Sequence, residues 1–240
     1  MAAMRYGRSL FRTNKTYTVH QYKNRSEWLR GRSDLRGIGG SDASCALGLN
    51  PWKSNLTLWR IKTGRETAPD ISHNERVWYG SNAEQYIRRL FQLKHAADYE
   101  IQYVADTILQ NNEHKEMLYS PDGLILTTDG RKGILEIKTT TIMRSIDKEK
   151  WYDRATREKV LPDNYYIQVL HGLNVTGFDF VDLYAELAYP DGHSELVPYH
   201  IERTDDQVEE DLRTVKEGII NFWQNYVLPD REPGLILPAI

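Results

Sequence analysis

Residues 120–140, SPDGLILTTDGRKGILEIKTT, carry the clearest structural pattern in the sequence. Two runs of alternating apolar residues flank Asp129-Gly130, a dipeptide that is typical of tight hairpin turns. The pattern therefore predicts a β-hairpin. Folding the chain at this turn places Asp122 opposite the segment from Glu136 to Lys138, so that three charged groups converge at one end of the hairpin.

These charges need a chemical explanation. Side chains alternate along a strand, so Glu136 and Lys138 share one face while Leu135 and Ile137 take the other. Two neighbouring carboxylates repel each other unless positive charge lies between them, and Mg²⁺ is a suitable ion because it binds carboxylate, water and phosphate oxygens. Lys138 would then orient or deprotonate a water molecule, or neutralise an anionic transition state. A simple strand-end salt bridge is the alternative interpretation.

The composition is that of an ordinary globular protein. The chain has 240 residues, of which 40% are apolar and 27% charged, and we expect one domain over residues 1–240. It contains no apolar run of the length of a membrane span or signal peptide, so we expect a cytoplasmic protein without membrane contact. Cys45 is the single cysteine, which excludes an internal disulfide and a four-cysteine metal or iron–sulfur site. We expect Cys45 to be a core residue.

Charge is distributed unevenly along the chain. Residues 1–65 hold 13 Lys/Arg and 3 Asp/Glu, whereas residues 66–240 hold 18 Lys/Arg and 31 Asp/Glu. A cationic third on an acidic body indicates a polyanionic partner on one side of the molecule. The alternative is a solvated charged surface without a partner.

The wider pattern predicts a mixed sheet flanked by helices, an α/β (α+β) fold. Helices are expected at 24–34, from Ser41 or Asp42 to Gly48, between Ser54 and Gly64, at 74–95, at 161–177, and at 204–227 with Thr204 as N-cap. The helix at 74–95 carries a predicted apolar stripe of Tyr86, Ile87, Leu90, Phe91 and Leu93. Strands are expected at 99–105, 106–110, 116–120, 123–127, 133–139, 178–188 and 195–203.

Several motifs resemble one known family. The pattern SPDG…LEIKTT is similar to the signature of the PD-(D/E)XK nucleases. The stretch RGIGGSDASCALGLNPWKSNLTLWRIKTG at 36–64 resembles the N-terminal block of YqaJ-type viral recombinases, relatives of lambda exonuclease. The similarity runs in order from about residue 25 to 180, and includes Trp28 and Arg32 four residues apart, the Gly-rich turn ending in Ser41, YGSNAE and YYIQVLHGL. It implies a restriction-endonuclease-like core with a mixed central sheet.

The resemblance also implies a site. Its metal ligands would be Glu84, Asp122 and Glu136 with the carbonyl of Ile137, holding two Mg²⁺ ions or Mn²⁺ in their place. Lys138 and Gln168 would complete the catalytic set, with Gln168 orienting the nucleophilic water. The implied DNA-binding residues are Arg32 and Ser41, which would grip a terminal 5′-phosphate, together with Trp28 and Tyr165.

Each of these residues has an ordinary structural alternative. Glu84 and Gln168 would be helix-surface side chains, Ser41 only an N-cap and Trp28 a core residue. Tyr165 shares a helix face with Gln168, because the two are three residues apart. His171 lies near that face, and we expect it to be structural or solvated.

The function implied by the resemblance is a Mg²⁺-dependent 5′→3′ double-stranded DNA exonuclease. It would resect DNA ends to 3′ overhangs for phage-type recombination in a bacterial host cell, with a single-strand annealing protein as partner and a homotrimeric ring as its assembly. A structure-selective endonuclease or resolvase on the same fold, and an inert DNA-binding or packaging accessory protein, are the alternatives.

Two segments stay unassigned. The basic extension at residues 1–20 contains Arg5, Arg8, Arg12 and Lys15 but lies outside the family resemblance. The polar stretch at 139–161 is expected to be a DNA-facing loop or a lid.

Overall fold

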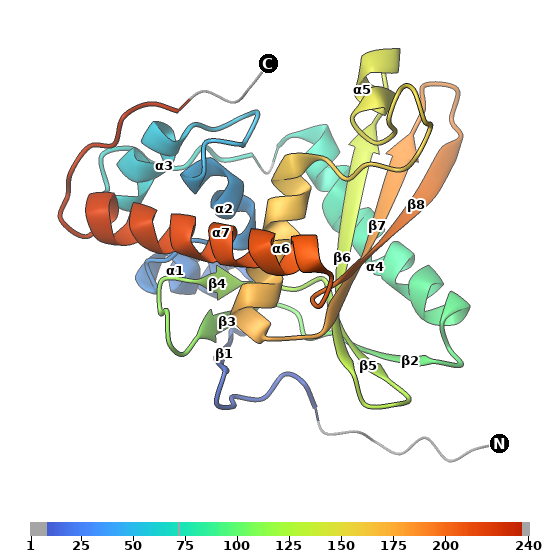
Figure 1. Ribbon diagram of the computed structural model, residues 1–240, viewed down its shortest axis with the longest axis horizontal. Helices are drawn as coiled ribbons and strands as arrows, with labels where there is room; N and C mark the ends of the chain where they lie inside the picture. The colour runs from blue at the N-terminus through green and yellow to red at the C-terminus, as the bar shows by residue number, and fades with distance from the viewer. Residues whose placement is uncertain (1–8, 72, 237–240) are drawn as a thin grey trace.

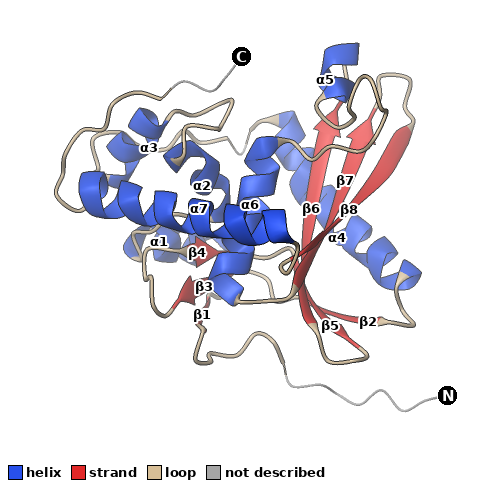
Figure 2. Cartoon of the chain, viewed as in Figure 1, coloured by secondary structure: helices blue, strands red, loops and turns tan. Residues whose placement is uncertain are grey.

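The centre of the fold is a five-stranded mixed sheet with the strand order β2-β5-β6-β7-β8. The computed structural model describes residues 9–71 and 73–236 (Figures 1 and 2). β6 pairs with β5 in antiparallel and with β7 in parallel orientation, so the predicted mixed sheet is confirmed. The strands are β2 (Tyr99–Gln102), β5 (Gly123–Thr127), β6 (Lys132–Thr141), β7 (Phe180–Ala188) and β8 (Ser194–Glu202).

The predicted hairpin is formed by β5 and β6. Gly123 faces Leu135, and the turn contains Gly130 with a φ of 89°, a left-handed conformation that glycine adopts without a steric penalty. Side chains of β6 alternate as expected, because Ile134 packs into the larger core and Leu135 into the smaller one. The register therefore brings Asp122, which directly precedes β5, close to Glu136.

Helices cover both faces of this sheet, as Figure 1 shows. On one face, α6 packs against β6 and β7, and α7 packs on α6 to complete the larger core around Ile134 and Leu183. On the other face, α4 places Ile87 and Phe91 against the smaller one. The helices are α1 (Arg25–Asp34), α2 (Gly40–Ala46), α3 (Asn55–Lys62), α4 (Glu75–Lys94), α5 (Ser145–Glu149), α6 (Asp163–Thr176) and α7 (Asp206–Phe222), and α7 continues as the π-helical segment Trp223–Val227.

The apolar stripe predicted on α4 is partly wrong. Only Ile87 and Phe91 of its five residues are buried, whereas Tyr86 is 66% and Leu93 76% exposed. The helix carries two apolar lines, and the Ile87–Phe91 line alone meets the sheet. Residues four apart lie on the same side of a helix, so the second line, at Tyr86 and Leu90, turns away from the core.

Two helix starts also differ from the expectation. α2 begins at Gly40 with Gly39 as N-cap, so Ser41 and Asp42 lie inside its first turn rather than capping it. The N-cap of α7 is Asp205 and not Thr204. The N-cap Ser54 of α3 is confirmed, since its hydroxyl accepts a hydrogen bond from the amide of Thr57.

A second, three-stranded sheet lies beside the first. It contains β1 (Tyr17–Gln21), β3 (Thr107–Asn111) and β4 (Leu118–Tyr119) in the order β1-β3-β4. β1 was not predicted, and it shows that the end of the basic extension pairs with β3. Arg5 and Arg8 lie outside the described residues. Ile38 forms a bridge with Met117, which ties the Gly-rich turn to this sheet.

Three further features complete the fold. Cys45 is fully buried, as expected. The stretch at 139–161 contains the end of β6, α5 and a loop in which Trp151 is buried. Among the described residues, no helix has the length and apolar character that a membrane crossing requires.

Candidate active site

Glu136 lies on the α6 side of β6 and is only 1% exposed. One oxygen, Oε2, accepts a hydrogen bond from the hydroxyl of Tyr119. The other, Oε1, accepts from Lys138 Nζ at 2.6 Å and from Gln168 Nε2 at 2.5 Å. A buried carboxylate is costly unless it is paired and hydrogen-bonded, and here both oxygens have donors from β4, β6 and α6.

Asp122 stands at the mouth of the hairpin. Its Oδ2 accepts a hydrogen bond from the backbone amide of Ile137 at 2.8 Å, which fixes the carboxylate against β6. The loss of solvent around Asp122, followed by repulsion from Glu136 and Glu84, raises its pKa well above the usual value. Asp122 therefore lies among carboxylates that repel it, and a bound cation would offset this repulsion.

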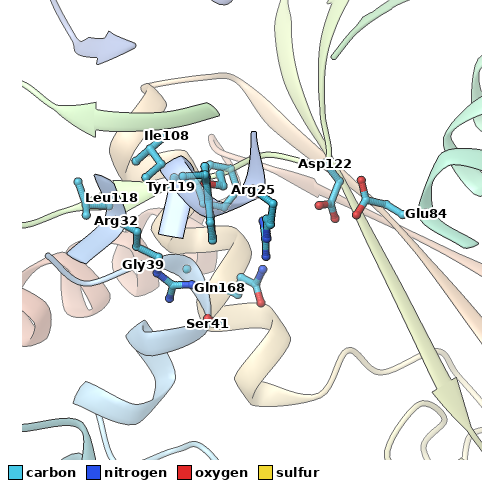
Figure 3. Close-up of a pocket in the computed structure, with 13 residues that line it drawn as sticks. Arg25, Arg32, Gly39, Ser41, Glu84, Ile108, Leu118, Tyr119, Asp122 and Gln168 are labelled. Carbon is cyan, nitrogen blue, oxygen red and sulfur yellow. The ribbon is translucent and has the colours of Figure 1, made fainter. Parts of the chain in front are cut away.

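Glu84 approaches the same place from α4. Figure 3 shows its carboxylate beside that of Asp122. Desolvation raises the pKa of Glu84, although Arg88 opposes the shift by pairing with the carboxylate. Arg88 also donates to the backbone carbonyl of Asp122 at 2.5 Å, so it ties α4 to the hairpin. Its guanidinium carbon lies 3.5 Å from the ring centroid of Tyr103.

Lys138 is a fixed positive charge in this cluster. Desolvation lowers its pKa, but attraction by Glu136 and Asp122 is stronger, and the pKa is raised above its usual value. Lys138 is therefore protonated at neutral pH, so it can donate a hydrogen bond to water or to an anionic transition state but cannot accept a proton. Its Nζ also lies 5.4 Å from the ring centroid of Tyr165, which stacks on Trp151.

The donor set fits a hard divalent cation. Asp122, Glu84 and Glu136 offer carboxylate oxygens, which Mg²⁺ and Mn²⁺ prefer. Within residues 9–71 and 73–236, however, no three His, Cys, Asp or Glu side chains already converge as a metal site. The reason is local, because Glu136 bonds to Tyr119, Lys138 and Gln168, and Glu84 pairs with Arg88. The oxygens fit, but the side chains must turn to share an ion.

A cationic pocket adjoins these carboxylates. Arg25, Trp28 and Arg32 lie three and four residues apart on α1, and therefore on one face of it. Trp28 is 5% exposed and packs on Ile108 and Leu118, so it is a core residue. The guanidinium carbons of Arg25 and Arg32 lie 3.8 Å and 5.5 Å from its ring centroid, where cation–π attraction holds them.

The pocket and the carboxylates form one cleft. Arg25, Arg32 and the exposed Ser41 line the same pocket of about 220 Å³ as Asp122 and Glu84, and Figure 3 shows Gln168 between the two groups. A wider groove of about 1060 Å³ continues from there along residues 139–141; Glu136, Ile137, Lys138, Tyr165 and Gln168 also line it. All of the predicted site residues therefore lie on this cleft or directly beneath it.

Four site residues were missed in the sequence. Arg25 and Arg88 have a detectable signal, because each stands at helical spacing from a predicted residue, Trp28 or Glu84. Tyr119 has no such signal in the sequence, because its contact with Glu136 depends on how β4 packs against β6. Asp42 is expected only as a helix cap, but it is buried and pairs with three cations. His171 is a core residue, as one expectation had it: its Nε2 bonds to the carbonyl of Leu118 at 2.8 Å, and burial lowers its pKa to about 4.

The mixed sheet, the helices on both its faces and the carboxylate–lysine hairpin define a restriction-endonuclease-like core. Two solved structures share the fold. One is an alkaline exonuclease, LHK-Exo, from Laribacter hongkongensis, with a TM-score of 0.54 and 17% identity, covering 83% of this chain and 93% of that one. The other is LHK-Exo in complex with dAMP, with a TM-score of 0.55, 16% identity and the same coverage.

The chain belongs to the YqaJ-like viral recombinase domain family, whose model matches residues 27–179. The segment contains every predicted site residue, from Trp28 to Gln168, and the predicted family resemblance is confirmed. The uncharacterized protein YqaJ of Bacillus subtilis (strain 168) is 32% identical over 212 residues, which cover 88% of this chain. The matched part spans only 59% of that relative's length.

Proposed function

We propose that this chain is a metal-dependent deoxyribonuclease that degrades one strand of duplex DNA from its 5′ end, leaving a 3′ overhang for recombination by strand annealing. One observation carries the proposal. The carboxylates of Asp122, Glu136 and Glu84, with Lys138 among them, open onto the same cleft as the Arg25–Arg32 pocket. The arginines would bind a terminal phosphate while the adjacent carboxylates hydrolyse the next phosphodiester bond, so the cleft suits a terminal nucleotide. The name of the alkaline exonuclease that shares the fold supports this choice.

Glu84, Asp122 and Glu136 would hold Mg²⁺, or Mn²⁺ in its place, as two ions, with the carbonyl of Ile137 as a further ligand. When bound, such ions supply Lewis-acid stabilisation of the scissile phosphate and lower the pKa of an attacking water. The raised pKa of Asp122 supports this assignment, because a cation is what would keep the carboxylate ionised.

The neighbouring side chains would act on the water and on the developing charge. Lys138, protonated and anchored by Glu136 at 2.6 Å, would donate to the anionic transition state. The amide nitrogen of Gln168 also bonds to Glu136, which turns the amide oxygen away from that bond and leaves it to accept from a water molecule. Gln168 would therefore orient the nucleophile.

Arg32, Arg25 and Ser41 would bind the terminal 5′-phosphate. A guanidinium matches phosphate oxygens with paired hydrogen bonds, and phosphate contacts carry no base information. We therefore expect end binding without sequence preference.

We also propose that the protein assembles as a homotrimeric ring. It would act with a single-strand annealing protein in the cytoplasm of a bacterial host cell. The exposed apolar line of Tyr86, Leu90 and Leu93 on α4 would suit a contact with another chain.

The phosphate pocket gives a first test. The wild-type protein should degrade a 5′-phosphorylated duplex about tenfold faster than a 5′-hydroxyl duplex, since charge-assisted bonds are worth about 1.5–3 kcal/mol each. Arg32→Ala should reduce this ratio to about twofold. Initial rates of mononucleotide release from the two substrates measure it.

Arg30→Ala is the matched control for this test. Arg30 lies on the same helix, is exposed and does not line the pocket, so its loss should leave the ratio unchanged. Equal wild-type rates on both substrates would contradict the role of the pocket in binding a terminal phosphate.

A further inference from the structure

Asp42, in the first turn of α2, is a buried carboxylate that holds three cations. It is 3% exposed, and its oxygens bond to Arg32 Nη2 at 3.3 Å, Lys53 Nζ at 2.7 Å and Lys62 Nζ at 2.9 Å. The three partners come from α1, from the loop before α3 and from α3. We call these four residues the Asp42 cluster.

The charge of the cluster is well defined. Burial alone would raise the pKa of Asp42, but Lys62, Arg32 and Lys53 together hold it well below its usual value, so the carboxylate is ionised. Three cations around one carboxylate leave a formal charge of +2. A terminal phosphate monoester carries about −1.5 to −2 at neutral pH, whereas an internal diester carries a single negative charge. Arg32 is the member of the cluster that lines the pocket, so it is the cation placed to meet a phosphorylated end.

Asp42 also determines where the Arg32 guanidinium lies. That group is held by the Asp42 carboxylate and by the Trp28 ring, 5.5 Å from its centroid. It packs directly on Gly39, where an added Cβ would lie 3.1 Å from Arg32 Nη2. Figure 3 shows Arg32, Gly39 and Ser41 together at the pocket wall. The Gly-rich turn thus leaves room for the guanidinium, and Asp42 supplies the charge that orients it.

The same carboxylate fixes the neighbouring loop. Lys53 lies in the segment after Asn50, whose side chain accepts from the amides of Trp52 and Lys53 and donates to Ser44 at 2.9 Å. Trp52 is 73% exposed and lines the wider groove. The Lys53–Asp42 bond therefore anchors to α2 a loop that forms part of the cleft.

We propose that Asp42 is a positioning residue of the phosphate pocket. Its carboxylate holds Arg32 and Lys53 in place, so that the cleft distinguishes a 5′-phosphate from a 5′-hydroxyl end. This inference rests on the proposed function, because it assigns the pocket to a DNA end. Asp42 itself acts through its cations and does not touch the DNA.

The test is equilibrium binding of 5′-phosphorylated and 5′-hydroxyl duplexes, each labelled at the far end, by fluorescence anisotropy with CaCl₂ in place of MgCl₂. The wild-type protein should bind the phosphorylated duplex about tenfold more tightly, and Asp42→Asn should bring the two Kd values to within about twofold of each other. Asp42→Glu retains the charge and should recover part of the preference.

Asp182→Asn is the matched control. Asp182 is also buried and pairs with a cationic side chain, His200 at 2.6 Å, but it lines neither the pocket nor the groove. Its variant should keep the wild-type ratio of Kd values. Should Asp42→Asn fail to fold by circular dichroism, Lys53→Met, which removes a partner whose side chain is 30% exposed, should still lower the ratio.

The outcomes separate the two proposals. A wild-type preference that persists in Asp42→Asn, or in Lys53→Met where the first variant does not fold, overturns the role of Asp42. A wild-type protein without any preference overturns the assignment of the pocket to a terminal phosphate, and the inference on Asp42 fails with it. DNA cleavage by the wild-type protein that nevertheless shows no preference would leave the nuclease assignment standing.

Discussion

Asp122→Asn should reduce DNA cleavage by at least about 10³-fold, the loss expected when a group that stabilises the transition state through bound metal is removed. The amide oxygen of Asn can still accept the hydrogen bond from Ile137, so the hairpin should keep its shape. Substitution also removes one of the mutually repelling carboxylates. The metal-free variant should therefore be as stable as the wild-type protein or more stable.

The gain in stability expected for Asp122→Asn increases with pH. The pKa of Asp122 is raised on folding, so its contribution to stability is present at low pH and is lost as the pH rises through the raised folded-state pKa. Asp122→Asn should therefore gain most in Tm at the higher pH values, in the presence of EDTA. Thermal denaturation at pH 5 and pH 8 measures this difference, with Asp129→Asn in the exposed hairpin turn as control. Full cleavage activity of Asp122→Asn would contradict the assignment of the site.

Lys138→Met should lower the rate of the chemical step by two or more orders of magnitude, about 3 kcal/mol or more in transition-state free energy. The affinity for DNA should change by less than about threefold, because the contribution of Lys138 is made mainly in the transition state. The variant should also be less stable by about 3–5 kcal/mol, since the 1%-exposed Glu136 loses its cation. Glu136 keeps its bonds to Tyr119 and Gln168, which favours the lower end of that range.

Single-turnover cleavage at saturating enzyme measures the chemical step separately from the affinity for DNA. Lys132→Met is the control, because Lys132 begins the same strand but is exposed. A normal single-turnover rate combined with a large rise in Kd would identify Lys138 as a clamp for DNA phosphate instead.

The hairpin and its charges could be predicted because their determinants are local. The turn dipeptide Asp129-Gly130 and the alternation along β6 together specify the register, and the register alone brings Asp122 to Glu136. The partners of Glu136 could not be found in this way. Tyr119 belongs to the other sheet, so its position depends on packing between β4, β6 and α6 rather than on any spacing.

The Asp42 cluster shows a second limit. A Ser-Asp pair after glycines is typical of a helix N-terminus, and local propensity favoured that interpretation. The cations that bury Asp42 are 10, 11 and 20 residues away in the sequence, and only the packing of α1 and α3 around α2 brings them together. The apolar pattern of α4 was ambiguous for a similar reason. Its two apolar faces look alike in the sequence, and only packing against the sheet shows that the face with Ile87 and Phe91 is buried.

We propose that the cleft hydrolyses DNA from an end and needs a divalent metal to do so. Both properties are tested by incubating a 5′-labelled linear duplex and a covalently closed circular duplex with the protein in one reaction, with Mg²⁺ or with excess EDTA. We predict that with Mg²⁺ the linear duplex releases its 5′ label as mononucleotide while the circle stays intact, and that EDTA stops all cleavage. Cutting of the circle would contradict end-dependent hydrolysis, and undiminished degradation in EDTA would contradict the need for a metal.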